Sequence, residues 1–229
     1  RAQFNVEPYL QDATPTSMRV MWESASEGTA TLEWGPDESL GNTEVSEGVA
    51  SPGGAMHDVL LDGLSPSSAC YYRVASGEAS TLIYRFKTPP LPEAESSFSF
   101  VAMSDMQKSS EDPDVFDEIV HQGVLDYFGG ETSEEIALVL IPGDLVVNGN
   151  TYEQWSGDFF APSHDLFAQV PLYPVLGNHE VNSTYYFSIS TCPKTEPQAM
   201  KNTGGTRTME TSGLWDSIPM PLTMAKTNL

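Results

Sequence analysis

Three short polar clusters in the second half of the chain carry the side chains that could do chemistry. Residues 104–107 follow the apolar run FSFVAM, residues 143–149 follow IALVLI, and residues 177–180 follow PLYPVL. Their carboxylate, amide and imidazole groups are ligands for hard to borderline divalent metals. A carboxylate can bridge two such ions, and the pair can hold a phosphate ester while generating hydroxide. The residue types therefore point to metal-dependent chemistry.

The elements around these clusters form an alternating pattern. Residues 98–103, 136–141 and 171–176 are predicted strands, and the second is apolar enough to be buried on both faces. Apolar residues at helical spacing predict a helix over residues 115–128, and a second helix is expected over residues 152–160. This order predicts an α/β unit with parallel strands and right-handed crossovers. All three clusters should then meet at the carboxyl edge of one sheet.

The first part of the chain shows a different pattern. Runs rich in β-branched and aromatic residues occur at residues 17–22, 29–34, 58–61, 71–75 and 81–87. Gly, Pro, Asp and Ser separate these runs, and no helical spacing interrupts them, which predicts an all-β sandwich. The polar, Pro-rich stretch PPLPEAESS then marks a domain boundary.

The charge balance excludes some classes of partner. Lys and Arg total 10 against 32 Asp and Glu, for a net charge of -22. Such a surface repels nucleic acid and anionic membranes, so no nucleic-acid scaffold is expected. No run approaches the length of a membrane span. Two cysteines give no disulfide framework and no CxxC site. The composition suits a secreted or salt-adapted protein, and we expect a secreted or extracytoplasmic location.

The clusters resemble the calcineurin-like metallophosphoesterases, whose blocks read Asp-x-His, Gly-Asp-x-x and Gly-Asn-His-Asp/Glu. The start of the chain, from EPYLQ at residues 7–11 to Met21-Trp22, resembles the N-terminal domain of purple acid phosphatases. The segment LSP before CYYRV is similar to the approach to the tyrosine corner of fibronectin type III domains, with Cys70 in the place of the tyrosine. The resemblance covers residues 5–187.

The resemblance divides the chain into four parts. It implies a fibronectin III-like sandwich over residues 1–90, a linker over residues 91–97 and the N-terminal half of a metallophosphoesterase domain over residues 98–187. Residues 188–229 are expected to lie outside the resemblance. The expected fold is therefore an all-β sandwich followed by an incomplete α/β domain.

The resemblance also assigns roles. It implies that Asp105 binds a first metal, Asp144 bridges two metals and Asn178 binds the second. Gln107 stands where the family has histidine, and both ligation and a capping role stay open for it. His179 is implied to contact the phosphate and help the leaving group, as general acid or as transition-state donor, without binding metal. The cofactors would be two divalent or mixed-valence ions such as Fe, Zn or Mn.

No catalytic or metal-binding role is expected for several other residues. Val147 occupies the position of the iron-binding tyrosine of purple acid phosphatases, so ferric–tyrosinate chemistry is not expected. Glu180 is expected to orient its neighbours. His57, His121 and His164 match no motif and are expected to be surface or helix residues.

The tail departs from the family. The family's further histidine ligands have no counterpart, because the last histidine is His179. Residues 188–229 hold four of the ten basic residues but three of the 32 acidic ones. A reading-frame slip after about residue 187 accounts for this. In the shifted frame, Met200-Lys201 forces Glu and Met209-Glu210 forces Gly, and a free choice of other codons gives family-like sequence. A divergent natural tail is the alternative.

The function implied by the resemblance is hydrolysis of phosphate esters by metal-activated water at a dinuclear site. This activity is expected to be impaired in the chain as it stands, because part of both metal shells is lacking. The alternative is a noncatalytic secreted binding or adhesion protein that uses the β-sandwich to dock onto a partner. The sequence predicts neither the particular ester nor the oligomeric state.

Overall fold

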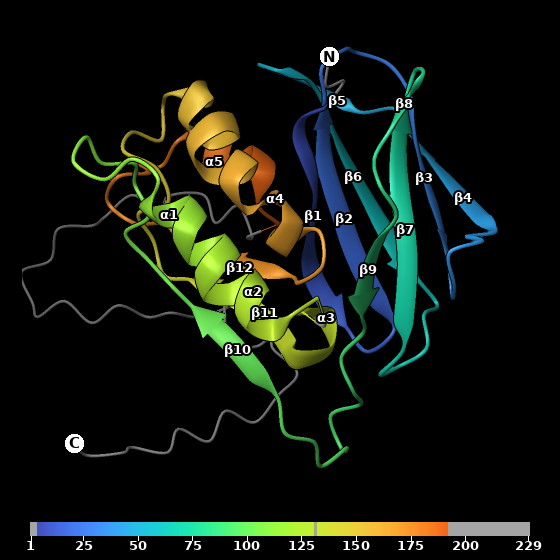
Figure 1. Ribbon diagram of the computed structural model, residues 1–229. Coiled ribbons are helices and arrows are strands. Elements are labelled where there is room, and N and C mark those ends of the chain that lie inside the picture. The colour runs from blue at the N-terminus through green and yellow to red at the C-terminus, as the bar shows by residue number, and fades with distance from the viewer. Residues whose placement is uncertain (1–3, 131, 192–229) are drawn as a thin grey trace, which may run out of the picture.

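The computed structural model describes residues 4–130 and 132–191 of the chain, in two regions (Figure 1). A β-sandwich, coloured blue to teal, lies on the right of Figure 1, and an α/β region lies on the left. The predicted fold class is confirmed. Of the tail predicted over residues 188–229, residues 192–229 lie outside the described part of the chain.

Two antiparallel sheets form the sandwich. The first has the order β1-β2-β6-β5, with β1 (Phe4–Thr14), β2 (Ser17–Ser24), β6 (Gly54–Asp62) and β5 (Val49–Ser51). The second has the order β4-β3-β7-β8, with β9 paired to β7, and comprises β4 (Asn42–Ser46), β3 (Ala30–Gly35), β7 (Ala69–Ser76), β8 (Ala79–Ser80) and β9 (Tyr84–Lys87). Alternate residues of β7 are buried, as expected for a strand with one face on the core.

Strand β1 is the main sandwich element that the sequence pattern did not predict. It contains Pro8, which lacks a backbone N–H and normally argues against a paired strand. The structure places Pro8 where the β1–β2 register shifts, between the pairs formed by Val6 and Tyr9. The irregular pairing there tolerates a residue that cannot donate to the ladder.

The expectation that His57 is a surface or helix residue is wrong. His57 lies in β6 and is fully buried, with its ring stacked on Trp22 at 4.9 Å between centroids. Its two ring nitrogens lie 3.0 Å from the hydroxyl oxygens of Ser24 and Ser46. Desolvation lowers the pKa of His57, while the hydrogen bond at Ser46 acts in the opposite direction. His57 is therefore part of the packed sandwich.

The α/β region contains three parallel strands in the order β10 (Ser99–Ala102), β11 (Ile136–Ile141) and β12 (Leu172–Pro174). The first crossover comprises α1 (Val115–Glu118), the π-type helix η1 (Ile119–Leu125), α2 (Asp126–Phe128) and α3 (Thr132–Glu135). The second comprises η2 (Gln154–Phe160) and α4 (Ala161–Phe167), and α5 (Thr184–Ile189) follows β12. Helices are present at both predicted positions, residues 115–128 and 152–160, whereas α3, α4 and α5 were not predicted.

Both crossovers pack on one face of the small sheet. The rings of Phe116 in α1 and Phe159 in η2 are stacked, with centroids 6.0 Å apart. Two crossovers of the same hand that advance along a sheet in one direction place their helices on the same side. None of the helices in the described part of the chain is long and apolar enough to cross a membrane.

The two regions share a hydrophobic core. Tyr9 of β1 packs against Phe160, with ring centroids 4.7 Å apart, and both belong to a cluster that includes Val139 of β11. The hydroxyl of Tyr72 in β7 donates to the carbonyl oxygen of Ala168 at 2.7 Å. Direct packing, in addition to the chain connection, therefore holds the regions together.

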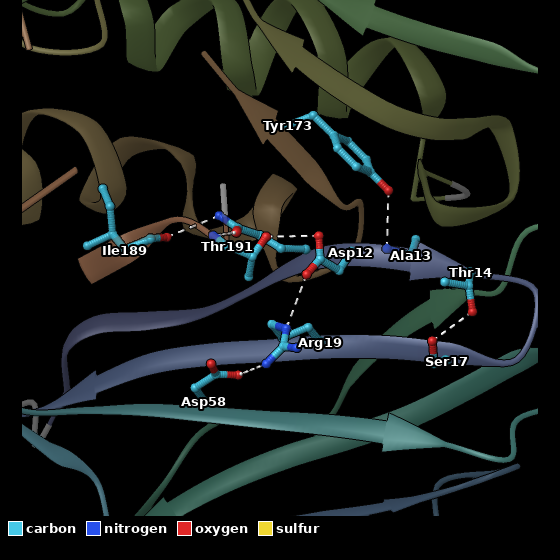
Figure 2. A network of polar contacts seen from close by, with 10 residues as sticks. Asp12, Ala13, Thr14, Ser17, Arg19, Asp58, Tyr173, Ile189 and Thr191 are labelled. Carbon is cyan, nitrogen blue, oxygen red and sulfur yellow. Dashed lines mark hydrogen bonds and ion pairs between the residues drawn. The ribbon is translucent and has the colours of Figure 1, made fainter. Parts of the chain in front are cut away.

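A polar network extends this contact along β1 (Figure 2). Figure 2 shows Arg19 between Asp12 and Asp58, with nitrogen–oxygen distances of 3.2 and 2.6 Å. The other Asp12 carboxylate oxygen accepts from the hydroxyl of Thr191 at 2.9 Å. The backbone N–H of Ala13 donates to the Tyr173 hydroxyl at 3.1 Å. The end of β1 thus contacts both β12 and the segment after α5.

Candidate active site

The three polar clusters follow parallel neighbouring strands. Asp105 comes three residues after β10, Asp144 three residues after β11 and Asn178 four residues after β12. Because the strands are parallel and adjacent, these residues follow the same edge of the sheet. The topology expected from the sequence is therefore present, while the assignment of these residues as metal ligands stays a prediction.

Backbone conformation sets these strand ends apart. Asp105 and Asp144 have positive φ angles of 58° and 56°, a left-handed conformation that is uncommon outside glycine. Such conformations cost free energy and persist where the surrounding structure enforces them, often at functional sites. Gly143 has a φ of 102°, and a Cβ added to it would lie 2.8 Å from the Cα of Gly177. The second and third clusters therefore touch backbone to backbone.

Glu180 ties those two clusters together. Its side chain is fully buried and accepts four backbone N–H groups. Oε2 accepts from Asp144 at 3.0 Å and from Gly177 at 2.6 Å, and Oε1 accepts from Leu145 at 2.8 Å and from Val146 at 3.4 Å. One carboxyl group therefore satisfies N–H groups from both loops, which confirms the expectation that Glu180 orients its neighbours.

His179 is fixed from three directions. Its backbone N–H donates to Oδ1 of Asp144 at 3.2 Å, and its carbonyl oxygen accepts from the N–H of Gly149 at 2.9 Å. Its ring Nδ1 lies 2.7 Å from the carbonyl oxygen of Val147. Because a carbonyl oxygen only accepts, Nδ1 carries the hydrogen, and Nε2 is the ring nitrogen available to a ligand.

Helix η2 contacts the loop after β11 through hydrogen bonds. The indole Nε1 of Trp155 donates to the carbonyl oxygen of Gly149 at 2.8 Å, and Trp155 is buried. A Cβ on Gly149 would collide with the backbone of Glu180, so only glycine fits there. The backbone N–H of Asn148 donates to Oε1 of Gln154 at 2.7 Å. These contacts connect the loop after β11 to both η2 and the loop after β12.

The first cluster is much more open. Asp105 is exposed, and its Oδ2 accepts from the hydroxyl of Ser104 at 2.6 Å. Gln107 is half-buried. Beyond it, Lys108 forms an ion pair with Asp158 of η2 at 3.4 Å. A cavity of about 420 Å³ beside this loop is lined by Met106 and Lys108 but by none of the predicted ligands.

The donor chemistry of the predicted ligands suits hard divalent cations. Asp105, Asp144 and Asn178 offer two carboxylates and one amide oxygen. Within residues 4–130 and 132–191, no three or more His, Cys, Asp or Glu side chains gather as a metal cluster.

Both regions match models of known protein families. A model of the purple acid phosphatase N-terminal domain matches residues 4–88, and a model of the calcineurin-like phosphoesterases matches residues 98–217. The second match continues past Phe187 into the tail. No curated protein matches the chain.

Two solved structures share the fold. The purple acid phosphatase PPD1 from seeds of yellow lupin (Lupinus luteus) has a TM-score of 0.60 and 23% identity, over 76% of this chain and 35% of that one. A structure of PhoD has a TM-score of 0.56 and 18% identity, over 78% of this chain and 40% of that one. The chain therefore spans well under half the length of either protein.

The family follows from the second of the two family matches. The calcineurin-like phosphoesterase model covers more than half of the 229 residues, including every strand and helix from β10 to α5. The purple acid phosphatase model covers the sandwich from its first strand to its last. The chain therefore belongs to the calcineurin-like phosphoesterase family and carries an N-terminal domain of the purple acid phosphatase type.

Proposed function

We propose that this chain carries the N-terminal half of the active site of a phosphate-ester hydrolase that uses two metal ions. The junction at Glu180 carries the proposal. It holds the loops of Asp144 and His179 in contact at the carboxyl edge of a parallel sheet, where α/β proteins place their sites. A carboxylate and an imidazole on two loops that are bonded to each other suit a reaction that needs a cation and a proton donor.

The ligand roles follow the donor types. Asp105 would hold the first ion, Asp144 would bridge the two ions, and Asn178 would hold the second. Gln107 would contribute an amide oxygen to the first ion or act as a cap. The ions, when bound, supply positive charge for the phosphate oxygens and lower the pKa of a water molecule that serves as nucleophile. The N–H of His179 donates to Oδ1 of Asp144 and so orients the carboxylate that would hold the ions.

His179 would act on the phosphate and the leaving group. The Val147 carbonyl holds Nδ1–H, so only Nε2 can face the substrate. In the imidazolium form, Nε2–H donates to a phosphate oxygen or passes its proton to the leaving-group oxygen as the P–O bond breaks. This role requires an oriented ring, which the three contacts of His179 provide.

We also propose the setting of this activity. The substrate would be a phosphate mono- or diester, and the protein would be secreted or extracytoplasmic. A net charge of -22 disfavours polyanionic substrates such as nucleic acid. Activity of the chain as it stands would be low, because Asp105, Asp144 and Asn178 supply only part of the shells of two ions.

A one-base slip in the reading frame near Phe187 would explain the missing ligands, and this stays a proposal. The nucleotide sequence across codons 183–192 tests it. We expect the other frame to continue with histidine-bearing metal motifs. Clean reads that confirm the present frame to Leu229 would contradict the slip.

The test of function compares variants of a chain restored to the other frame. Asp144→Asn should remove more turnover of an aryl phosphate than Gln107→Ala. A bridging carboxylate offsets the repulsion between two cations, whereas Gln107 offers at most one neutral oxygen. Equal losses in the two variants would show that the first cluster binds its ion differently from this account.

The His179→Ala variant distinguishes a proton-donor role of His179 from a role as metal ligand. We expect unchanged metal content, measured by elemental analysis, and turnover reduced by about 10²–10³-fold, the usual effect of losing one donor of this kind. A His179→Ala protein without metal would show that His179 is a ligand.

A further inference from the structure

A polar junction connects the sandwich to the candidate site. Glu23 at the end of β2 is 1% exposed, and one of its carboxyl oxygens accepts a hydrogen bond from the Tyr152 hydroxyl. The other oxygen accepts from the backbone N–H of Gly53 at 3.3 Å. A Cβ on Gly53 would collide with both the Tyr152 hydroxyl and the Glu23 carboxyl group, so the junction has no spare room.

Tyr152 stands between the junction and the second cluster. It follows Gly149 by three residues and lies two residues before the start of η2, which contains Trp155. Thr151, beside it, donates its N–H to the carbonyl oxygen of Asn148 at 3.0 Å. The Trp155 indole then holds the carbonyl oxygen of Gly149 at 2.8 Å. A displacement of Tyr152 would therefore move the far end of the Asp144 loop.

Tyr152 also contacts the element that follows the third cluster. Its ring lies edge-on to the ring of Tyr185 in α5, with centroids 5.9 Å apart. Helix α5 begins shortly after Glu180, and Ser183 caps it by accepting from the N–H of Tyr185 at 3.1 Å. One side chain thus touches the elements behind both loops that Glu180 joins.

We propose that Glu23 and Tyr152 are positioning residues, through which the sandwich sets the geometry of the loops that carry Asp144 and His179. The proposal rests on the proposed function, because those loops matter as a site only if they bind metal and phosphate. Its physical basis is the cost of burying an unsatisfied polar group. Glu23 has no access to water, so the Tyr152 hydroxyl stays bound to it and anchors the start of η2.

A matched pair of variants tests this on the protein as it exists. Tyr152→Phe and Tyr72→Phe each remove one tyrosine hydroxyl that bridges the two regions, but the partner of Tyr72 is Ala168 in the loop after α4. Amide hydrogen exchange by NMR reports local opening residue by residue. For the Leu145 and Gly149 amides, we compare the exchange rate with that of amides that exchange only on global unfolding. Tyr152→Phe should raise the ratio of these two rates about tenfold or more. Tyr72→Phe should leave the ratio unchanged.

Variants at Glu23 provide a second, independent comparison. In Glu23→Gln, the amide oxygen can accept from the Gly53 N–H while the NH₂ group donates to the Tyr152 hydroxyl oxygen, because a hydroxyl both donates and accepts. This variant should exchange at nearly the wild-type rate, whereas Glu23→Ala should match Tyr152→Phe. The indole N–H resonance of Trp155 should shift in Glu23→Ala and Tyr152→Phe only. Equal acceleration in Tyr152→Phe and Tyr72→Phe would overturn the proposal, as would failure of Glu23→Gln to retain protection. Neither the amide exchange rates nor the Trp155 resonance depends on metal or turnover. They therefore test the positioning role separately from the proposed phosphate-ester hydrolysis.

Discussion

The two sides of the candidate site are built in different ways. On one side, the loops after β11 and β12 share Glu180, touch at Gly143 and Gly177, and clamp His179 through three hydrogen bonds. On the other side, Asp105 is exposed and is bonded to the adjacent serine. The difference shows that the fold preorganises Asp144 and His179, the proposed bridging residue and proton donor, whereas Asp105, the proposed first ligand, lies on an open loop.

This contrast has a physical reason. A buried carboxyl group that accepts four N–H groups is costly to disrupt, because each lost partner leaves a buried polar atom unsatisfied. An exposed carboxylate such as Asp105 loses little when its neighbours move, since water replaces them. Substitutions on the two sides should therefore have very different effects on stability.

Glu180→Gln should give the largest effect. Both oxygens of Glu180 face N–H donors, so in either orientation the amide NH₂ group meets two of them. Leaving two buried groups unsatisfied should lower the free energy of unfolding by about 2–5 kcal/mol, measured by urea denaturation. A loss no larger than that of a surface substitution would mean that Glu180 does not hold the loops.

Gly177→Ala should follow in size. A Cβ there would collide with the Asp144 side chain and backbone, so the free energy of unfolding should fall by about 1–3 kcal/mol. Gly123→Ala is the matched control, because its Cβ would meet only Ile119 Cγ2, at 4.0 Å in η1. It should stabilise the protein by up to about 1 kcal/mol. Similar losses in both variants would argue against close packing of the two loops.

A pH series extends the comparison to a buried imidazole in the sandwich. The folded state lowers the pKa of His57 below its ordinary value of 6.5, so below that pH the unfolded state binds more protons. The stability that neutral His57 contributes is complete above pH 6.5 and is lost as the pH falls through the folded-state pKa.

The measurement is urea denaturation at pH 7.5 and at about pH 5, for the wild type and for His57→Asn. Because the chain carries 32 acidic residues, only the difference between the two proteins isolates His57. We expect the wild type to lose more stability on acidification than the variant. Parallel behaviour of the two proteins would show that burial does not perturb His57.

Asp105→Asn should give the smallest effect on stability. Asp105 is exposed, so we expect a change within about 0.5 kcal/mol in the free energy of unfolding. The same substitution should weaken binding of Mn²⁺ if Asp105 is a ligand. A large loss of stability would show that the open loop is as tightly held as the other side, and the comparison would then fail.

Much of the fold could be predicted from local pattern. Strand β11 was predicted with its observed bounds, because its six residues form one continuous apolar run between polar segments. Strand β1 was missed because Pro8 conceals a strand whose pairing is irregular there. His57 was misread because a single imidazole gives no sign of the two serines and the tryptophan that surround it.

The candidate site also has features that the sequence predicts and features that it does not. Polar residues after three apolar runs were enough to predict that the clusters follow one sheet edge, and the topology has this form. The junction of Glu23 with Tyr152 joins residues 129 positions apart, and no spacing rule relates them. Such pairs become visible only in three dimensions, because they depend on how the sandwich packs against the second region.

The most direct test of the proposed metal site is paramagnetic broadening of backbone amide NMR signals by Mn²⁺. If Asp105, Asp144 and Asn178 face one cation site, the lowest Mn²⁺ concentrations should broaden the amides of all three loops together. Asp144→Asn should then abolish this broadening and leave weaker effects at the acidic surface. Broadening that begins elsewhere on the surface, or that persists unchanged in Asp144→Asn, would contradict the site.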